Sequence, residues 1–169
     1  MDYMNENRRN SRPLSTQEQH EKQILSLRLQ MATLCSVDFI INDSVKVRTN
    51  NFPSLKKLQD SAPELLNSTY LNWLEVNQES SSLQDVLDEQ WLPYLISGNE
   101  SNALMKQDNH RWDVHHFFSR IGFSSDDKQA LVYHEMYCSG GVPQCGTMYF
   151  FEFHFNLWKQ KGSFGVFNQ

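Results

Sequence analysis

The chain has 169 residues, a formal net charge of −5 and a pI near 5.6. A chain of this length fits one domain and can bury roughly two thirds of its unfolded surface. The acidic balance disfavours general nucleic-acid binding, because no broad cationic surface is available to neutralise phosphates. No apolar run reaches the roughly 18 residues that a membrane-spanning helix requires. Residues 1–19 lack the apolar core of a secretory signal peptide, so we expect a cytoplasmic protein by default, with the cell envelope or periplasm as the alternative.

The first third of the chain combines a polar arm with a helical pattern. Residues 1–14 are rich in polar types and predict a loosely ordered arm, which leaves 15–169 as a single domain. Ser15 and Glu18 match a capping box, in which each side chain bonds to a backbone amide of the other. The apolar residues that follow recur at steps of three and four, and predict a helix from about Thr16 to Leu34 with one apolar face: Ile24, Leu27, Met31 and Leu34.

The middle of the chain gives shorter and weaker patterns. The β-branched stretches 37–41 and 45–47, separated by polar residues, predict a short hairpin or bent strand. A short helix is expected over 53–59, and a longer one to about Gln78, with Pro63 at its first position. The segment 83–96 is ambiguous because Pro93 interrupts a helical pattern. A short helix is expected over 99–105.

From Trp112 the pattern changes to the alternation that is typical of strands. A strand is expected over 117–123, with Phe117, Ile121 and Phe123 on one face, followed by a turn at 124–127 and a strand over 130–137. The next strand has the strongest alternation, and its expected core face is listed here: Tyr149, Phe151, Phe153, Phe155 and Leu157. A final turn at 159–162 would precede an edge strand over 164–167. The predicted fold is α+β, with N-terminal helices packed on a C-terminal antiparallel β-meander of about four strands.

Cys138 and Cys145 bound the turn between the last two long strands. If they lie opposite each other, Val132 pairs with Phe151 and His134 with Tyr149, and the apolar faces of both strands coincide. Opposed residues place their Cβ atoms near the span that a disulfide prefers. Three interpretations remain open at this point: a disulfide, two free thiols, or a metal or redox role, for which the six-residue spacing is unusual.

The same segment resembles an uncharacterised bacterial family. The residues that carry the resemblance are Ser119-Arg120-Ile121-Gly122-Phe123, Gln129-Ala130-Leu131-Val132-Tyr133 and the loop from Cys138-Ser139-Gly140-Gly141 to Cys145-Gly146. They are similar to the "SRVGF", "QALVY" and Cys-Gly-Gly series of that family. Its members have no assigned activity and often follow an export or lipoprotein signal. The resemblance therefore implies a fold and hints at an envelope location, and implies no reaction.

Two groups of side chains are candidates for a functional site. The histidines at 110, 115, 116, 134 and 154 could serve a metal, but the adjacent His115 and His116 point to opposite faces of a strand. No metal site is therefore predicted. The second group lies on the less regular sheet face and consists of types enriched in protein interfaces, which makes the following residues candidates for a binding surface: Arg120, Tyr133, Tyr137, Phe150 and Trp158. Packing in the core is the favoured interpretation of the aromatic residues, and a structural ion pair with a carboxylate or an exposed rim position is the favoured interpretation of Arg120.

No nucleophile elbow, phosphate loop or dinucleotide fingerprint is present in the sequence. The leading hypothesis is a non-enzymatic bacterial module that binds another protein, as an inhibitor or immunity-type protein does. It uses no catalytic residue and no cofactor. The alternative hypothesis is a small hydrolase or metal-dependent enzyme that uses the histidines and Cys138.

Overall fold

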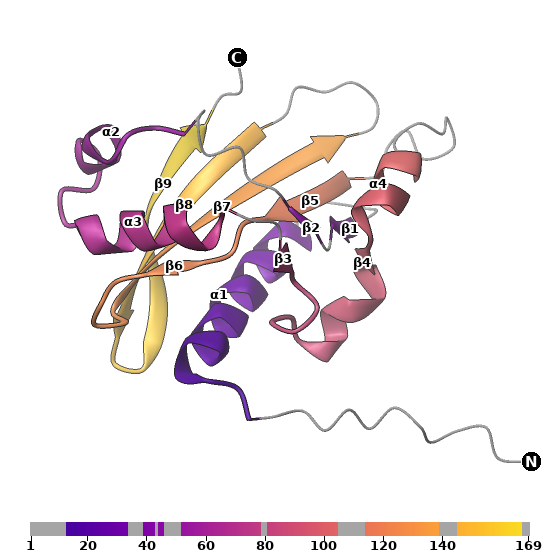
Figure 1. Ribbon diagram of the computed structural model, residues 1–169, viewed down its shortest axis with the longest axis horizontal. Helices are drawn as coiled ribbons and strands as arrows, with labels where there is room; N and C mark the ends of the chain where they lie inside the picture. Colours follow the sequence, from indigo (N-terminus) through magenta and orange to yellow (C-terminus); the bar gives the residue numbers. More distant parts are fainter. Residues whose placement is uncertain are drawn as a thin grey trace, which may run out of the picture.

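The computed structural model describes residues 13–33, 39–42, 44–45, 52–78, 81–104, 114–138 and 145–166. These residues form an α+β fold, as predicted, in which helices pack on a largely antiparallel sheet (Figure 1). The elements in chain order are α1 (Thr16–Thr33), β1 (Phe39–Asn42), β2 (Ser44–Val45), α2 (Leu55–Gln59), α3 (Asn67–Val76), β3 (Ser81–Ser82), the 3-10 helix η2 (Glu89–Tyr94), β4 (Leu95–Ile96), α4 (Gly98–Leu104), β5 (Val114–Phe118), β6 (Gly122–Phe123), β7 (Gln129–Cys138), β8 (Cys145–His154) and β9 (Leu157–Val166). The expected arm falls mostly on residues 1–12, outside the described ranges.

The main sheet is seven-stranded, with the order β4-β1-β5-β7-β8-β9 and with β6 paired to β7. The strands β5, β7, β8 and β9 are antiparallel neighbours and form the predicted meander. The short strand β1 lies parallel to both β4 and β5. Of the two arrangements predicted for 37–47, the hairpin is wrong for the described residues, because β1 pairs with β4 and β5 and β2 pairs with β3 in a separate small sheet. The partners of β1 come from later in the chain, which local patterns cannot indicate.

Two apolar cores lie on opposite faces of the sheet. On one face, Ile24, Leu25 and Leu29 of α1 pack with a cluster that includes Val132 and Phe151. On the other face, Leu58 of α2 and Trp73 of α3 pack with Leu131, Tyr133 and Phe150. Burial on both faces explains why β7 reads as a nearly continuous apolar run from Ala130 to Tyr133.

The first helix begins with the predicted capping box. The backbone N of Ser15 donates to the Glu18 carboxylate over 2.7 Å, and the backbone N of Glu18 donates to Ser15 Oγ over 3.2 Å. The predicted apolar face is wrong in part, because Leu27 and Met31 are exposed. The buried positions of α1 form a neighbouring stripe that consists of Glu21, Ile24, Leu25, Arg28 and Leu29. Two of these residues, Glu21 and Arg28, are charged.

The single strand expected over 117–123 is interrupted. Phe118 opposes His134 and Gly122 opposes Leu131, so three residues on one strand face two on the other. One extra residue is a β-bulge, and it reverses the alternation of side chains. As a result Phe118 lies in the same core cluster as Ile121 and Phe123, whereas an uninterrupted strand over 117–123 would place it on the opposite face.

Two other boundaries differ from the prediction. The helix α3 begins at Asn67, four residues after Pro63, and 63–66 form a turn and an extended segment. The long strand expected to reach Leu157 instead ends at His154 and turns back at Phe155 and Asn156. Tyr149, Phe151 and Phe153 contact the core as predicted, whereas Phe155 and Leu157 are exposed.

The register at the cysteine-bounded turn is shifted by two residues from the predicted one. Cys145 opposes Met136, and Val132 opposes Tyr149. Cys138 pairs with Val114 of β5 instead. A shift of two preserves the side-chain faces, so the argument from coinciding apolar faces could not distinguish the registers. The side chains of both cysteines lie outside the described part of the chain, and their disulfide stays a prediction without the support of direct opposition.

Candidate functional site

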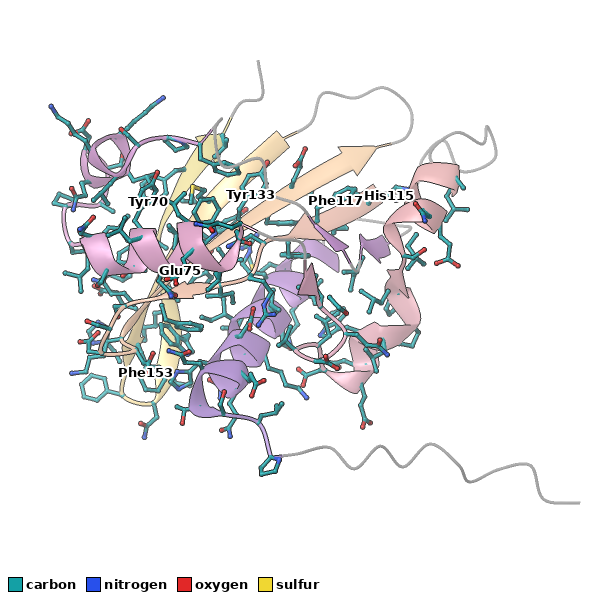
Figure 2. The ribbon with its side chains drawn as sticks, in the orientation of Figure 1. Tyr70, Glu75, His115, Phe117, Tyr133 and Phe153 are labelled. Carbon is teal, nitrogen blue, oxygen red and sulfur yellow. The ribbon has the colours of Figure 1, made fainter. Side chains whose placement is uncertain are left out.

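The five residues predicted to form a binding surface do not come together. Tyr133, which is labelled in Figure 2, is buried with an exposed fraction of 2%. Phe150 has an exposed fraction of 0%, and both residues belong to the core cluster that includes Trp73 of α3. Trp158 is buried in the core on the opposite face. Arg120 lies between β5 and β6 and is occupied by an ion pair, and the side chain of Tyr137 is outside the described residues. Core packing, the alternative weighed from the sequence, therefore accounts for Tyr133, Phe150 and Trp158.

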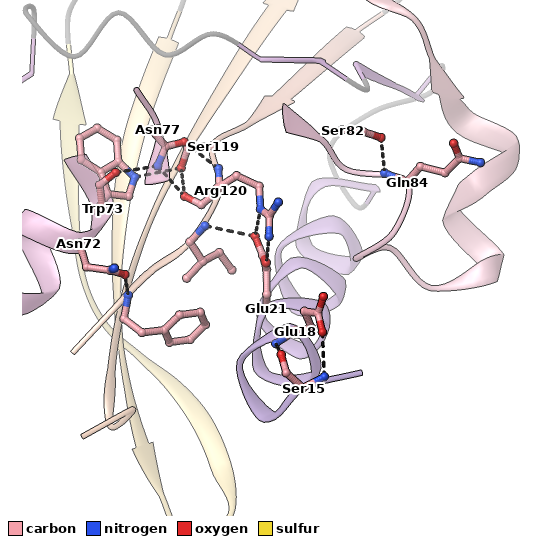
Figure 3. A network of polar contacts seen from close by, with 12 residues as sticks. Ser15, Glu18, Glu21, Asn72, Trp73, Asn77, Ser82, Gln84, Ser119 and Arg120 are labelled. Carbon is pink, nitrogen blue, oxygen red and sulfur yellow. Dashed lines mark hydrogen bonds and ion pairs between the residues drawn. The ribbon is translucent and has the colours of Figure 1, made fainter. Parts of the chain in front are cut away.

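Arg120 anchors the β-bulge to the first helix (Figure 3). Its Nε and Nη2 donate to the two carboxylate oxygens of Glu21, over 2.5 and 2.6 Å. The backbone N of Ile121 donates to the same carboxylate over 3.3 Å. The hydrogen bond and charge of Glu21 raise the pKa of Arg120 despite its partial burial. This pair has a structural role, because it satisfies a carboxylate that α1 places against the sheet.

Ser119 and Asn77 complete this network and connect it to α3 (Figure 3). Ser119 Oγ accepts from Trp73 Nε1 over 3.0 Å and from the backbone N of Tyr133 over 2.9 Å, and donates to the backbone O of Arg120. The side-chain amide of Asn77 bonds the backbone N and O of Arg120. The Ser-Arg pair of the sequence motif therefore holds two helices to the bulge, and carries no exposed reactive group.

A buried histidine pair lies on the α1 side of the sheet. Nδ1 of His116 and Nε2 of His134 are 2.9 Å apart, and the exposed fractions of the two residues are 0% and 4%. The ring of Phe118 stacks on His134 at 4.2 Å between centroids. The contact requires one nitrogen to donate and the other to accept, which two neutral imidazoles provide.

The surroundings of this pair favour the neutral forms. Burial lowers the pKa of His116 to about 4, with a further contribution from His115. Burial holds the pKa of His134 well below its ordinary value, helped by His116 and by Arg28. Both histidines are among the candidates predicted from the sequence, but their contact depends on the register between β5 and β7, which local patterns do not indicate.

The other histidines do not converge on this pair. His115 lies on the opposite face of β5, as the alternation predicted, and His154 is exposed near the β8–β9 turn beside Glu152. His110 lies outside the described residues. Among the residues that the structure describes, no group of three His, Cys, Asp or Glu side chains is arranged to hold a metal ion. In the same ranges, no helix has the length and apolar character needed to cross a membrane.

The most exposed feature with apolar character is the turn between β8 and β9. Phe155 is 94% exposed and Leu157 62% exposed. Beside the turn lies a cavity of about 380 Å³, and we call the cavity and the turn together the hairpin-tip site. The cavity is lined by Leu66, Asp126, Lys128, Gln129, Glu152, Phe153, His154 and Phe155.

The polar wall of the hairpin-tip site is held in place by several contacts. Gln129 accepts from the backbone N of Leu66 over 2.9 Å and donates to the backbone O of Glu64 over 2.8 Å. Glu152 is within 3.1 Å of His154 and 3.5 Å of Lys161. Burial is the largest single effect on the pKa of the Glu152 carboxyl and raises it. The contacts with His154 and Lys161 together outweigh burial, so the pKa is lowered. The site therefore has a fixed polar rim beside an exposed aromatic ring.

Phe155 also has an unusual backbone conformation. Its φ is 50°, and that of Asn156 is 61°. Two consecutive positive φ angles are typical of the tight hairpin turn that favours Asn-Gly, and a bulky residue there is a strained exception. Sequence reasoning missed this site because Phe155 continues the alternation of aromatic residues. Asn156 was the signal for a turn.

Comparisons with known proteins give no relative for this chain. No known family, curated protein or solved structure matches it. The resemblance to the bacterial family with the "SRVGF" and "QALVY" series therefore stays a prediction.

Proposed function

We propose that this protein is a non-enzymatic module that binds another protein through the hairpin-tip site. The observation that carries the proposal is Phe155, whose ring is 94% exposed on a residue with a φ of 50°. Exposure of the ring leaves its apolar surface in water, and the left-handed backbone adds strain. Phe155 therefore lowers the stability of the fold in two ways. Strained residues cluster at binding sites, which supports a binding role for this residue.

The surroundings of Phe155 support a protein as the partner. Anchor residues of protein interfaces are often aromatic, and a polar rim surrounds them. The hairpin-tip site combines such residues, because the charged Glu152 and Lys128 and the apolar Leu66 line the same cavity as Phe155. The finer form of the proposal is an inhibitor or immunity-type protein, which would suppress the activity of its partner on binding.

A photo-crosslinking amino acid placed at position 155 in producing cells tests the proposal. The matched control carries the same group at Leu71, which is 53% exposed on α3. We expect a discrete protein adduct from position 155 alone, and competition by excess wild-type chain but not by Phe155→Asn. The same adducts from both positions, or none from position 155, would contradict the proposal. Suppression of the captured partner's activity would then test the inhibitor form.

A hydrolase or metal-dependent enzyme is the second candidate function. The observation that favours it is the 2.9 Å contact between His116 and His134, two groups able to transfer protons or bind metal. Its other named residue, Cys138, has its side chain outside the described ranges. Metal analysis of the purified protein tests this candidate. A stoichiometric metal that is lost in His134→Phe would replace the binding module as the favoured function.

A further inference from the structure

The helix α1 carries two charged residues on its buried stripe, Glu21 and Arg28, with exposed fractions of 3% and 7%. They are seven positions apart, which is close to two helical turns. The charge of Glu21 is neutralised by Arg120. For Arg28 no carboxylate lies within ion-pair distance among the described residues. Within the described part of the chain, one buried charge of this stripe is therefore neutralised and the other is not.

The contacts of Arg28 are specific but leave its charge uncompensated. Its Nη1 donates to Oε1 of Gln160 on β9 over 3.2 Å. Its guanidinium carbon lies 3.5 Å from the centre of the Tyr149 ring. Its Nε is buried and bonds no described group. A buried cation without a counter-ion is costly, because the neighbouring ring and amide replace only part of its hydration.

One edge of this guanidinium is suited to an anion. Nη1 is bound to Gln160, so Nε and Nη2 are the pair left for another acceptor, and these two donors match the two oxygens of a carboxylate. Ser163 opposes Tyr149 in the sheet and is exposed on the same face. Gly165, the next residue of β9 on that face, has no side chain and is exposed.

We infer that Arg28, together with Tyr149, Gln160 and Ser163 at the β9 edge, forms a binding site for a carboxylate group. A single guanidinium matches the single charge of a carboxylate better than the two charges of a phosphate monoester. Burial lowers the pKa of the nearby His134, which is paired with His116, and so disfavours a second cation at this place. The carboxylate could belong to a small metabolite or to a peptide, since both present the same two oxygens. The inference is independent of the hairpin-tip site.

The first test is titration of the wild-type protein with sodium acetate and with a short peptide, at an ionic strength matched with chloride. The peptide is used with a free and with an amidated C-terminus. Saturable binding of acetate or of the free-acid peptide is expected, and the amidated peptide should not bind. A free-acid peptide that binds more tightly than acetate would indicate a peptide source. The absence of saturable binding by both carboxylates would overturn the inference.

Two substitutions assign the binding to Arg28. Arg28→Lys keeps the positive charge but removes the two parallel N–H donors of the guanidinium. It should weaken carboxylate binding at least about tenfold. Gln160→Glu places a carboxylate beside the guanidinium from an exposed position, and should raise the melting temperature and abolish acetate binding. Gln90→Glu, an equal charge change on the exposed surface of η2, is the control and should do neither. Binding that persists unchanged in Gln160→Glu would overturn the inference even if Arg28→Lys fails to fold.

Discussion

The carboxylate of Glu21 on α1 binds the guanidinium of Arg120 in the bulge between β5 and β6, across 99 positions of the chain. Its contacts fasten the first helix to the point where the sheet changes its alternation. The pair also places Arg120 in the fold rather than in a binding surface, which is the alternative that the sequence left open for this residue.

Substitution of Glu21 by Gln should lower the free energy of unfolding by about 2 kcal/mol, measured by urea denaturation. The loss should be smaller than for a fully buried pair, because the exposed fraction of the Arg120 side chain is 29%. Asp88→Asn is the matched control, since it breaks the 3.1 Å ion pair with Lys22, in which each side chain is about one third exposed. The control should lose well under 1 kcal/mol. Equal losses in the two variants would contradict a special role for the Glu21 pair.

Gly122 lies where α3 approaches the sheet most closely, and a Cβ atom at this position would overlap the backbone of Trp73. Gly122→Ala should therefore lower the melting temperature and cost about 2 kcal/mol or more, because a backbone cannot yield as a side chain does. Gly162→Ala is the control, since its Cβ would lie 3.5 Å from the Phe164 ring, an ordinary contact. A loss no greater at Gly122 than at Gly162 would show that α3 can move away at little cost.

The sequence predicts those parts of the fold that depend on local patterns. The capping box of α1 and the strand expected over 130–137 follow from neighbouring residues, and both are confirmed. The α+β class follows from the change of pattern near Trp112. The pairing of β1 with β4 and β5, by contrast, depends on segments far along the chain, and no local signal identifies them.

The errors near the candidate sites have a common physical cause. A β-bulge at Ser119–Ile121 and a turn at Phe155–Asn156 each change which face an aromatic residue occupies, while the sequence alternation continues through both. The contact between His116 and His134 depends on the register of β5 against β7, which the sequence did not specify. Composition therefore indicates that aromatic residues and histidines are available, but it does not indicate which of them come into contact in the fold.

The buried histidine pair should make the protein sensitive to acid. Burial lowers the pKa of His116 from 6.5 to about 4, and the same cause holds the pKa of His134 well below its ordinary value. Below pH 6.5 the unfolded chain therefore binds protons that the folded chain does not. The free energy of unfolding should fall as the pH decreases, by up to about 1.4 kcal/mol per pH unit for each histidine.

Urea denaturation between about pH 7 and pH 5, above the range of ordinary carboxyl groups, measures this effect. His134→Phe removes one of the two titrating groups, while Arg28 from α1, Tyr149 from β8 and His116 from β5 still face the position. Its slope of stability against pH should be about half that of the wild type. The exposed His154→Gln should keep the full slope. An unchanged slope in His134→Phe would mean that the pair is not the source of the acid sensitivity.

Phe155 should be destabilising in the isolated protein. Asn tolerates the left-handed conformation better than Phe does. The ring of Phe155 contributes little to the packing of the core, because the residue is 94% exposed. Phe155→Asn should therefore raise the free energy of unfolding by about 1 kcal/mol. Leu157→Asn, also exposed but in the extended strand β9, should give no gain, because Asn is disfavoured in strands. A loss of stability in Phe155→Asn would show that the ring packs against the cavity beside it. A gain, together with failure of Phe155→Asn to compete for the crosslinked partner, would mean that the ring serves binding at the expense of the stability of the fold.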